Sequence, residues 1–111
     1  RTSVFINPEI NMVKGAHSVG ADRIELYTEP YALKYGMDKN LAIKPYIEAS
    51  RKAKDLGLGV NAGHDLNLDN IEFFSKEITN LLEVSIGHAL ICESLYLGLE
   101  NVIPMYIGKI K

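Results

Sequence analysis

The chain has 111 residues, 47% of them hydrophobic and 23% charged, with a formal net charge of −2. This is the composition of an ordinary soluble globular protein, and the length allows about one domain. The slightly negative charge and the scattered basic residues argue against a nucleic-acid binder, and no apolar run approaches the roughly 20 residues of a membrane helix. The single cysteine, Cys92, cannot form an internal disulfide, which favours a reducing cytoplasm.

The chain starts unusually for a natural domain. Arg1 and Thr2 lead directly into the apolar run Val4–Ile6, with no initiator methionine before them. Natural domains seldom begin inside a core strand. We therefore expect the N-terminal part of a longer protein to be missing.

Four units of similar pattern follow one another, each a short apolar strand, a polar turn and a helical stretch. The runs are short and partly β-branched, as is typical of buried parallel strands. The predicted strands are Ser3–Ile6, Arg23–Tyr27, Leu58–Asn61 and Glu83–Ile86.

The predicted helices follow these strands. The first has Asn7 as its N-cap and Pro8 in its first turn, and Gly20 ends it. The second runs to about Leu56 and either begins or bends at Pro45. A third, short helix is capped by Asn67 or Asp69, with Ile71, Phe74 and Ile78 facing inward, and two more are expected at Leu90–Leu97 and Leu99–Ile110.

Alternating strands and helices predict an α/β fold with a parallel sheet. Two closures of the sheet fit this pattern, an open doubly wound sheet or part of a (β/α)₈ barrel. The longest stretch predicted to be irregular is Glu29–Asn40, and loops of that length in compact domains are often functional.

Polar residues recur where each strand ends, which is where parallel α/β folds bind their ligands. This recurrence predicts the rim of an active site. The residues are Asn7 after the first strand, Tyr27, Thr28 and Glu29 after the second, Asn61, Gly63, His64 and Asp65 after the third, and Ser85, Gly87 and His88 after the fourth.

Gly87 directly follows the fourth predicted strand, and His88 and Ala89 open the short helix Leu90–Leu97. Glycine allows close approach of the backbone to a ligand, and free N–H groups at a helix start favour an anion. This indicates a phosphate site, although a glycine turn with a capping histidine gives the same pattern.

His64 directly follows the small residues Asn61, Ala62 and Gly63, which are predicted to form a tight turn. A neutral imidazole can transfer protons near neutral pH, so His64 is a candidate general acid or base, the alternative being an ordinary loop histidine. No third ligand with a clear spacing joins His64 and His88, so no metal site is expected.

Glu25 lies between Ile24 and Leu26 in a predicted core strand. Inside a barrel its carboxylate would be buried and would need a partner. Its neighbours along the strand, Arg23 included, are expected to point to the opposite face, which disfavours a simple ion pair with Arg23.

Four segments together resemble the pyridoxine 5′-phosphate synthase family: "RTSVFIN", "GADRIELYTEPYA", "LGLGVNAGHDLNLDNI" and "EVSIGHALICESLYLGLENVI". The resemblance spans the chain and keeps the motif order. It implies a (β/α)₈ TIM barrel, of which residues 1–111 supply the C-terminal half with strands five to eight, assembled as a homo-octamer. It also implies condensation of 3-amino-2-oxopropyl phosphate with 1-deoxy-D-xylulose 5-phosphate to pyridoxine 5′-phosphate, phosphate and water, without metal or organic cofactor.

The resemblance assigns roles to five residues. His64 matches the proton donor and Glu25 a glutamate that stabilises a transition state. Asp65 matches a position that contacts the aminooxopropyl phosphate, where many members have glycine, so its role depends on whether the contact is through the backbone. Gly87 and His88 match the pair that binds a phosphate. Other family site residues belong to the first half-barrel, so we expect this chain alone to be inactive and to pair with that half or with a copy of itself.

Two other functions also fit the pattern. One is a different phosphate-binding barrel enzyme, such as an isomerase or aldolase, although no strand ends in the lysine that a Schiff-base aldolase needs. The other is a non-catalytic half-barrel that only binds a phosphate ligand or assembles.

Overall fold

Four parallel strands form one sheet in the computed structural model, which describes residues 2–86 and 99–110. The spatial order of the strands follows the chain order. The strands are β1 (Ser3–Ile6), β2 (Arg23–Tyr27), β3 (Gly59–His64) and β4 (Leu81–Ile86), and the helices are α1 (Ile10–Ser18), α2 (Glu29–Tyr35), α3 (Lys39–Asp55), α4 (Ile71–Glu77) and α6 (Leu99–Ile110).

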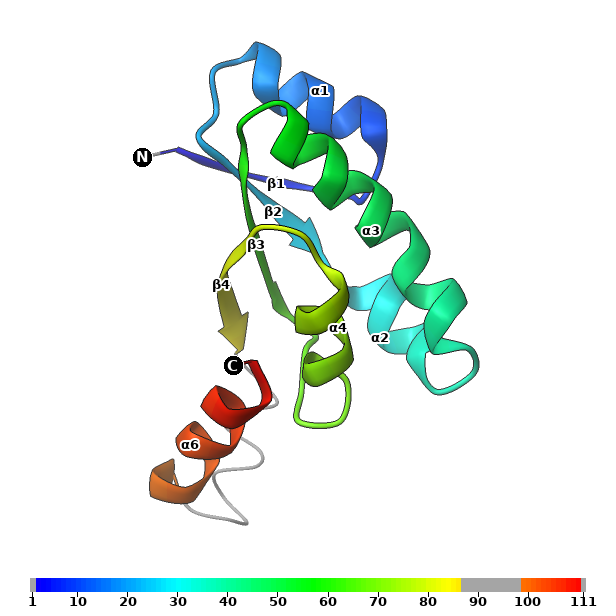
Figure 1. Cartoon of the computed structure of the whole chain (residues 1–111), viewed down its shortest axis with the longest axis vertical. Coiled ribbons are helices and arrows are strands. Elements are labelled where there is room, and N and C mark those ends of the chain that lie inside the picture. The colour runs from blue at the N-terminus through cyan, green and yellow to red at the C-terminus, as the bar shows by residue number, and fades with distance from the viewer. Residues whose placement is uncertain (1, 87–98, 111) are drawn as a thin grey trace.

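Helices α1 to α4 lie on one side of the sheet, and α6 packs against α4 beyond the end of β4 (Figure 1). Alternate strand residues point into the layer between sheet and helices. Ile24, Leu26 and Val60 point there and are completely buried. The described residues therefore form an α/β fold with two layers, in which one face of the sheet is covered.

No described helix covers the other face of the sheet (Figure 1). Phe5 and Leu82 are 56% and 51% exposed, and Glu25 is only partly buried. In register across the strands, Phe5 lies beside Glu25, Glu25 beside Asn61, and Asn61 beside Glu83. This uncovered face thus carries a row of mostly polar side chains.

The structure confirms the predicted bounds of β1 and β2, whereas β3 starts one residue later and ends three residues later than predicted, and β4 starts two residues earlier. The residues Asn61, Ala62 and Gly63, predicted to turn, are strand residues that pair with β2. Glycine at position 63 allows β3 and β4 to pack closely, because a Cβ there would lie 2.7 Å from the backbone oxygen of Ser85. The strand therefore continues to His64.

The start of α1 differs from the prediction. Glu9, not Asn7, occupies the N-cap position, because the carbonyl of Asn7 accepts a hydrogen bond from the Glu9 N–H at 2.8 Å in a tight turn before the helix. Gly20 ends the helical region as predicted, with a φ of 82°.

Helix α3 begins at Lys39, well before Pro45, which lies inside it. The Asp38 side chain caps this start by accepting hydrogen bonds from the N–H groups of Asn40 and Leu41. The stretch Glu29–Asn40 is not irregular either, since its first seven residues form α2.

Three aromatic rings hold the helix layer together. Tyr31 of α2 packs edge-on against Tyr46 of α3 and Phe74 of α4, with ring centroids 5.9 and 5.0 Å away. The Tyr46 hydroxyl donates to the carbonyl of Tyr27 at 2.6 Å, and burial raises the pKa of Tyr46 to about 12. This cluster fixes α2, α3 and α4 against the carboxyl end of β2.

The predicted inward face of α4 is also confirmed: Ile71, Phe74 and Ile78 are buried. Asn70 is the N-cap, while the side chain of Asn67 accepts from the N–H groups of Asp69 and Asn70. Helix α6 has the predicted bounds. Within residues 2–86 and 99–110, no helix combines the length and the apolar character needed to cross a membrane.

Gly57, which follows α3, offers a test of the loop geometry. Its φ of 78° lies in the left-handed region, so Gly57→Ala should lower the free energy of unfolding by about 1 kcal/mol. Gly36 has a φ of −69° and equally open surroundings, so Gly36→Ala should be neutral or slightly stabilising. Urea unfolding of both variants measures the difference, and equal midpoints would contradict the assignment.

Candidate active site

Polar side chains gather where β2 and β3 end. The two strands are parallel and in register, with Tyr27 beside Gly63, so their carboxyl ends lie at the same edge of the sheet. Tyr27, Thr28 and Glu29 leave β2 at this edge, and His64 and Asp65 leave β3. The polar residues predicted at these two strand ends therefore lie at one edge of the sheet, and their role in an active site stays a prediction.

Glu25 and His64 lie close together at this edge. The Nδ1 atom of His64 is 3.9 Å from Oε2 of Glu25, and their side chains are 67% and 23% exposed. Glu25 is thus not fully buried in this chain, because it lies on the uncovered face of the sheet. The expectation of a polar partner is met by His64, a group that can exchange protons beside a carboxylate.

The backbone of His64 adopts an uncommon conformation. Its φ is 58°, and the N–H of Asp65 donates to the carbonyl of Gly63 at 2.8 Å, which closes a γ-turn around His64. Residues other than glycine seldom adopt this region, and such strain is concentrated at functional sites. The turn projects the imidazole from the strand end toward Glu25.

Asp65 has a backbone that is already engaged. Besides bonding to Gly63, its N–H donates to Oγ1 of Thr28 at 3.3 Å, and its carbonyl accepts from Nδ2 of Asn70 at 3.4 Å. The N–H of Asp65 is therefore already engaged, whereas the carboxylate of this partly exposed residue takes part in none of these three hydrogen bonds.

Arg23 shares a sheet face with Glu25, and the expectation of opposite faces was wrong. Residues two apart on a strand point the same way. The Arg23 guanidinium nevertheless bonds elsewhere, donating to Oε1 of Glu83 at 3.0 Å and to Oδ1 of Asn61 at 3.3 Å. Sequence reasoning missed the contact with Glu83, although the strand alternation in β2 and β4 carries the signal.

Tyr27 and Glu29 form a second contact at the rim. The Tyr27 hydroxyl donates to Oε2 of Glu29. This hydrogen bond, with smaller contributions from desolvation and from the charges of Glu29 and Asp65, raises the pKa of Tyr27. The phenol therefore stays protonated at neutral pH and can act as a hydrogen-bond donor.

Gly87 and His88, predicted to bind phosphate, lie outside the described residues, as does the predicted helix Leu90–Leu97. Among the residues that are described, no cluster of three or more histidine, cysteine, aspartate or glutamate side chains is arranged to hold a metal ion. The absence of a metal from the complete site stays a prediction.

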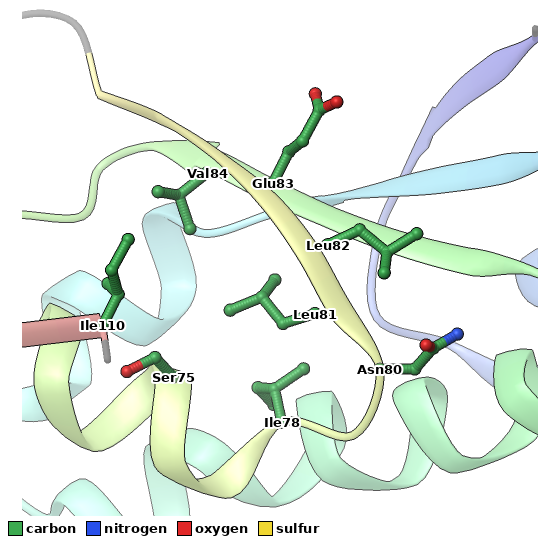
Figure 2. Close-up of a pocket in the computed structure, with 8 residues that line it drawn as sticks. All are labelled: Ser75, Ile78, Asn80, Leu81, Leu82, Glu83, Val84 and Ile110. Carbon is green, nitrogen blue, oxygen red and sulfur yellow. The ribbon is translucent and has the colours of Figure 1, made fainter. Parts of the chain in front are cut away.

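An open pocket of about 410 Å³ lies away from this edge, between β4, α4 and α6. Leu81, Ile78 and Ile110 point toward its centre, while Glu83 points away from it (Figure 2). The pocket contains neither Glu25 nor His64 and runs along β4, whose second edge pairs with no strand in the described part of the chain.

A parallel sheet with helices on one face and an imidazole–carboxylate pair at its carboxyl edge defines an α/β protein with its candidate site where such folds bind ligands. The sequence matches the family model described as "Pyridoxal phosphate biosynthesis protein PdxJ" over residues 1–111, and the chain belongs to that family.

Three similar curated proteins share the name "Pyridoxine 5'-phosphate synthase". The chain is 58% identical over 111 residues to "Pyridoxine 5'-phosphate synthase" of Flavobacterium johnsoniae and 59% identical over 111 residues to that of Cytophaga hutchinsonii. These alignments cover 100% of the chain and 47% of each relative. A third, from Parabacteroides distasonis, is 58% identical over 96% of the chain and 44% of the relative. The chain thus spans about half the length of these enzymes.

Proposed function

We propose that the chain is the C-terminal half of a pyridoxine 5′-phosphate synthase. The complete enzyme condenses 3-amino-2-oxopropyl phosphate with 1-deoxy-D-xylulose 5-phosphate and releases pyridoxine 5′-phosphate, phosphate and water, with no metal or organic cofactor. The observation that carries the proposal is the Glu25–His64 pair at the carboxyl edge of a parallel sheet, in a chain 58% identical to a named synthase.

The proposed architecture is a (β/α)₈ barrel in which β1 to β4 are strands five to eight. In such a barrel the helices cover the outside of the sheet and the other face lines the interior. The uncovered face with Glu25, Asn61 and Arg23 suits that interior. The edge of β4 that pairs with no described strand, and the pocket beside it, suit pairing with the first strand of the N-terminal half (Figure 2).

Each candidate residue has a role in this proposal. His64 donates a proton to a leaving group or to an atom that carries negative charge. The carboxylate of Glu25 stabilises positive charge that develops in the transition state. Asp65 contacts the aminooxopropyl phosphate through its side chain. Gly87 and His88 bind a phosphate, and the complete protein assembles as a homo-octamer.

The imidazole of His64 lies 3.9 Å from the carboxylate of Glu25, so the proposed proton donor and the proposed charge-stabilising group are close enough to act on one substrate. A single group of this kind typically contributes about 10²- to 10⁴-fold to the rate.

The chain of 12.3 kDa is expected to show no turnover when produced alone, because the other half of the proposed site is absent from it. Adding the N-terminal half, or expressing both halves as one protein, should restore condensation of the two phosphates. The measurement is pyridoxine 5′-phosphate formation, with intact mass verified for each sample. Turnover by the isolated chain would overturn the proposed division of the site.

A further inference from the structure

We infer that Thr28 is a positioning residue, whose hydroxyl holds the γ-turn of β3 that aims His64 at Glu25. Thr28 lies at the end of β2, one strand away from the turn, and is completely buried. The inference deepens the proposed function and rests on it for its kinetic consequence, since it concerns how the proposed proton donor is placed.

The Thr28 hydroxyl bonds on both sides of His64. It donates to the carbonyl of Gly63 and accepts the N–H of Asp65 at 3.3 Å. A hydroxyl has one proton to donate and lone pairs to accept, so a single group satisfies both partners. The two peptide groups that flank His64 are thereby tied to β2, the strand that carries Glu25.

The Thr28 hydroxyl makes these bonds instead of capping the helix that follows it. Thr28 is the N-cap of α2, where threonine normally accepts a hydrogen bond from an N–H in the first turn. No such side-chain bond forms here, and the hydroxyl reaches a strand 35 residues away instead. In the first turn of α2 the N–H of Tyr31 instead donates to the hydroxyl of Tyr46 at 3.3 Å, and the N–H of Ala32 makes the first helical hydrogen bond, to the Thr28 carbonyl, at 3.0 Å.

The turn needs such support because His64 has a φ of 58°. This conformation is unfavourable for a residue with a Cβ and persists where surrounding bonds impose it. Relaxation of His64 to an ordinary φ would rotate the imidazole away from the carboxylate of Glu25, which is 3.9 Å distant. Displacement of a catalytic group by about 1 Å can reduce a rate by about 100-fold.

Three variants of the complete protein test the inference. Thr28→Val keeps the shape and loses the hydroxyl, whereas Thr28→Ser keeps the hydroxyl. Ser50→Ala is the matched control: Ser50 is also completely buried, and its hydroxyl likewise donates to a carbonyl, of Ile47, and accepts an N–H, of Thr79, but far from β3's end.

We expect Thr28→Val to lower kcat by roughly 10- to 100-fold with KM little changed. Thr28→Ser should retain most of the activity, and Ser50→Ala should lose stability without loss of kcat. A Thr28→Val protein with unchanged kcat would overturn the inference. So would an equal loss in Thr28→Ser, which would assign the effect to packing, or an equal loss in Ser50→Ala, which would assign it to stability.

A second measurement does not depend on turnover. Hydrogen exchange of the Asp65 amide and the nuclear Overhauser contacts of the His64 ring report the turn directly by NMR. Thr28→Val, or Thr28→Ala if valine prevents folding, should speed this exchange and weaken the contact with Glu25. An unchanged turn contradicts the inference even if the protein has no condensation activity. A changed turn in such a protein would contradict the proposed function alone.

Discussion

Replacing His64 by asparagine should reduce turnover of the complete enzyme by roughly 10²- to 10⁴-fold, the contribution expected of one general acid. Asparagine is the best replacement because it tolerates the left-handed conformation, where His64 has a φ of 58°. It fills the turn without an ionisable group. Binding of inorganic phosphate should persist, because the proposed phosphate pair is Gly87 and His88.

His17 provides the matched control for this prediction. It lies exposed in the last turn of α1, and its replacement by asparagine should leave turnover unchanged. Turnover is measured as pyridoxine 5′-phosphate formed, and phosphate binding by calorimetry. If His64→Asn lost phosphate binding but kept its turnover, His64 would be a ligand-binding residue and not the acid.

The sequence predicted the local elements best where one residue decides the outcome. Gly20 and Gly57 end helical regions with φ values of 82° and 78°, as their position after an apolar helical pattern indicates. The strands β1 and β2 kept their predicted bounds, and each sends apolar side chains to the covered face, Ile6 from β1 and Ile24 and Leu26 from β2. These features depend on neighbours in the chain, which a sequence displays.

Predicted element bounds failed for different reasons, in one case because of a distant contact and in another because of a local turn. The small residues Asn61 to Gly63 read as a turn, yet Gly63 allows close packing against Ser85 of β4. Asn7 and Pro8 resemble a helix start, yet a tight turn delays α1 to Ile10. Sequence spacing alone carries neither the close approach nor the delay.

The candidate site was predictable in part. Recurrent polar residues at strand ends indicated the edge on which His64 lies, and a parallel sheet brings Glu25 of β2 to the same edge. The hydrogen bonds from Thr28 that hold the γ-turn around His64 were not predictable, because they join residues 35 and 37 positions apart. A threonine after a strand reads as an ordinary helix cap.

Replacing Glu25 by glutamine should lower turnover by about 10²- to 10³-fold, the usual cost of removing one group that stabilises charge in a transition state. Glutamine preserves the size of the side chain and removes its charge. Glu83→Gln is the control, since Glu83 lies in the same row of the uncovered face but bonds to Arg23. It should change stability more than turnover.

The pair Glu25 and His64 should also act as a unit. If the two groups act together across their 3.9 Å contact, then the double variant Glu25→Gln/His64→Asn loses little more than the worse single variant. Independent groups would instead multiply their losses. Measuring kcat for both single variants, the double variant and the unaltered protein distinguishes these outcomes, and fully multiplicative losses would show that the contact does not couple the two residues in the reaction.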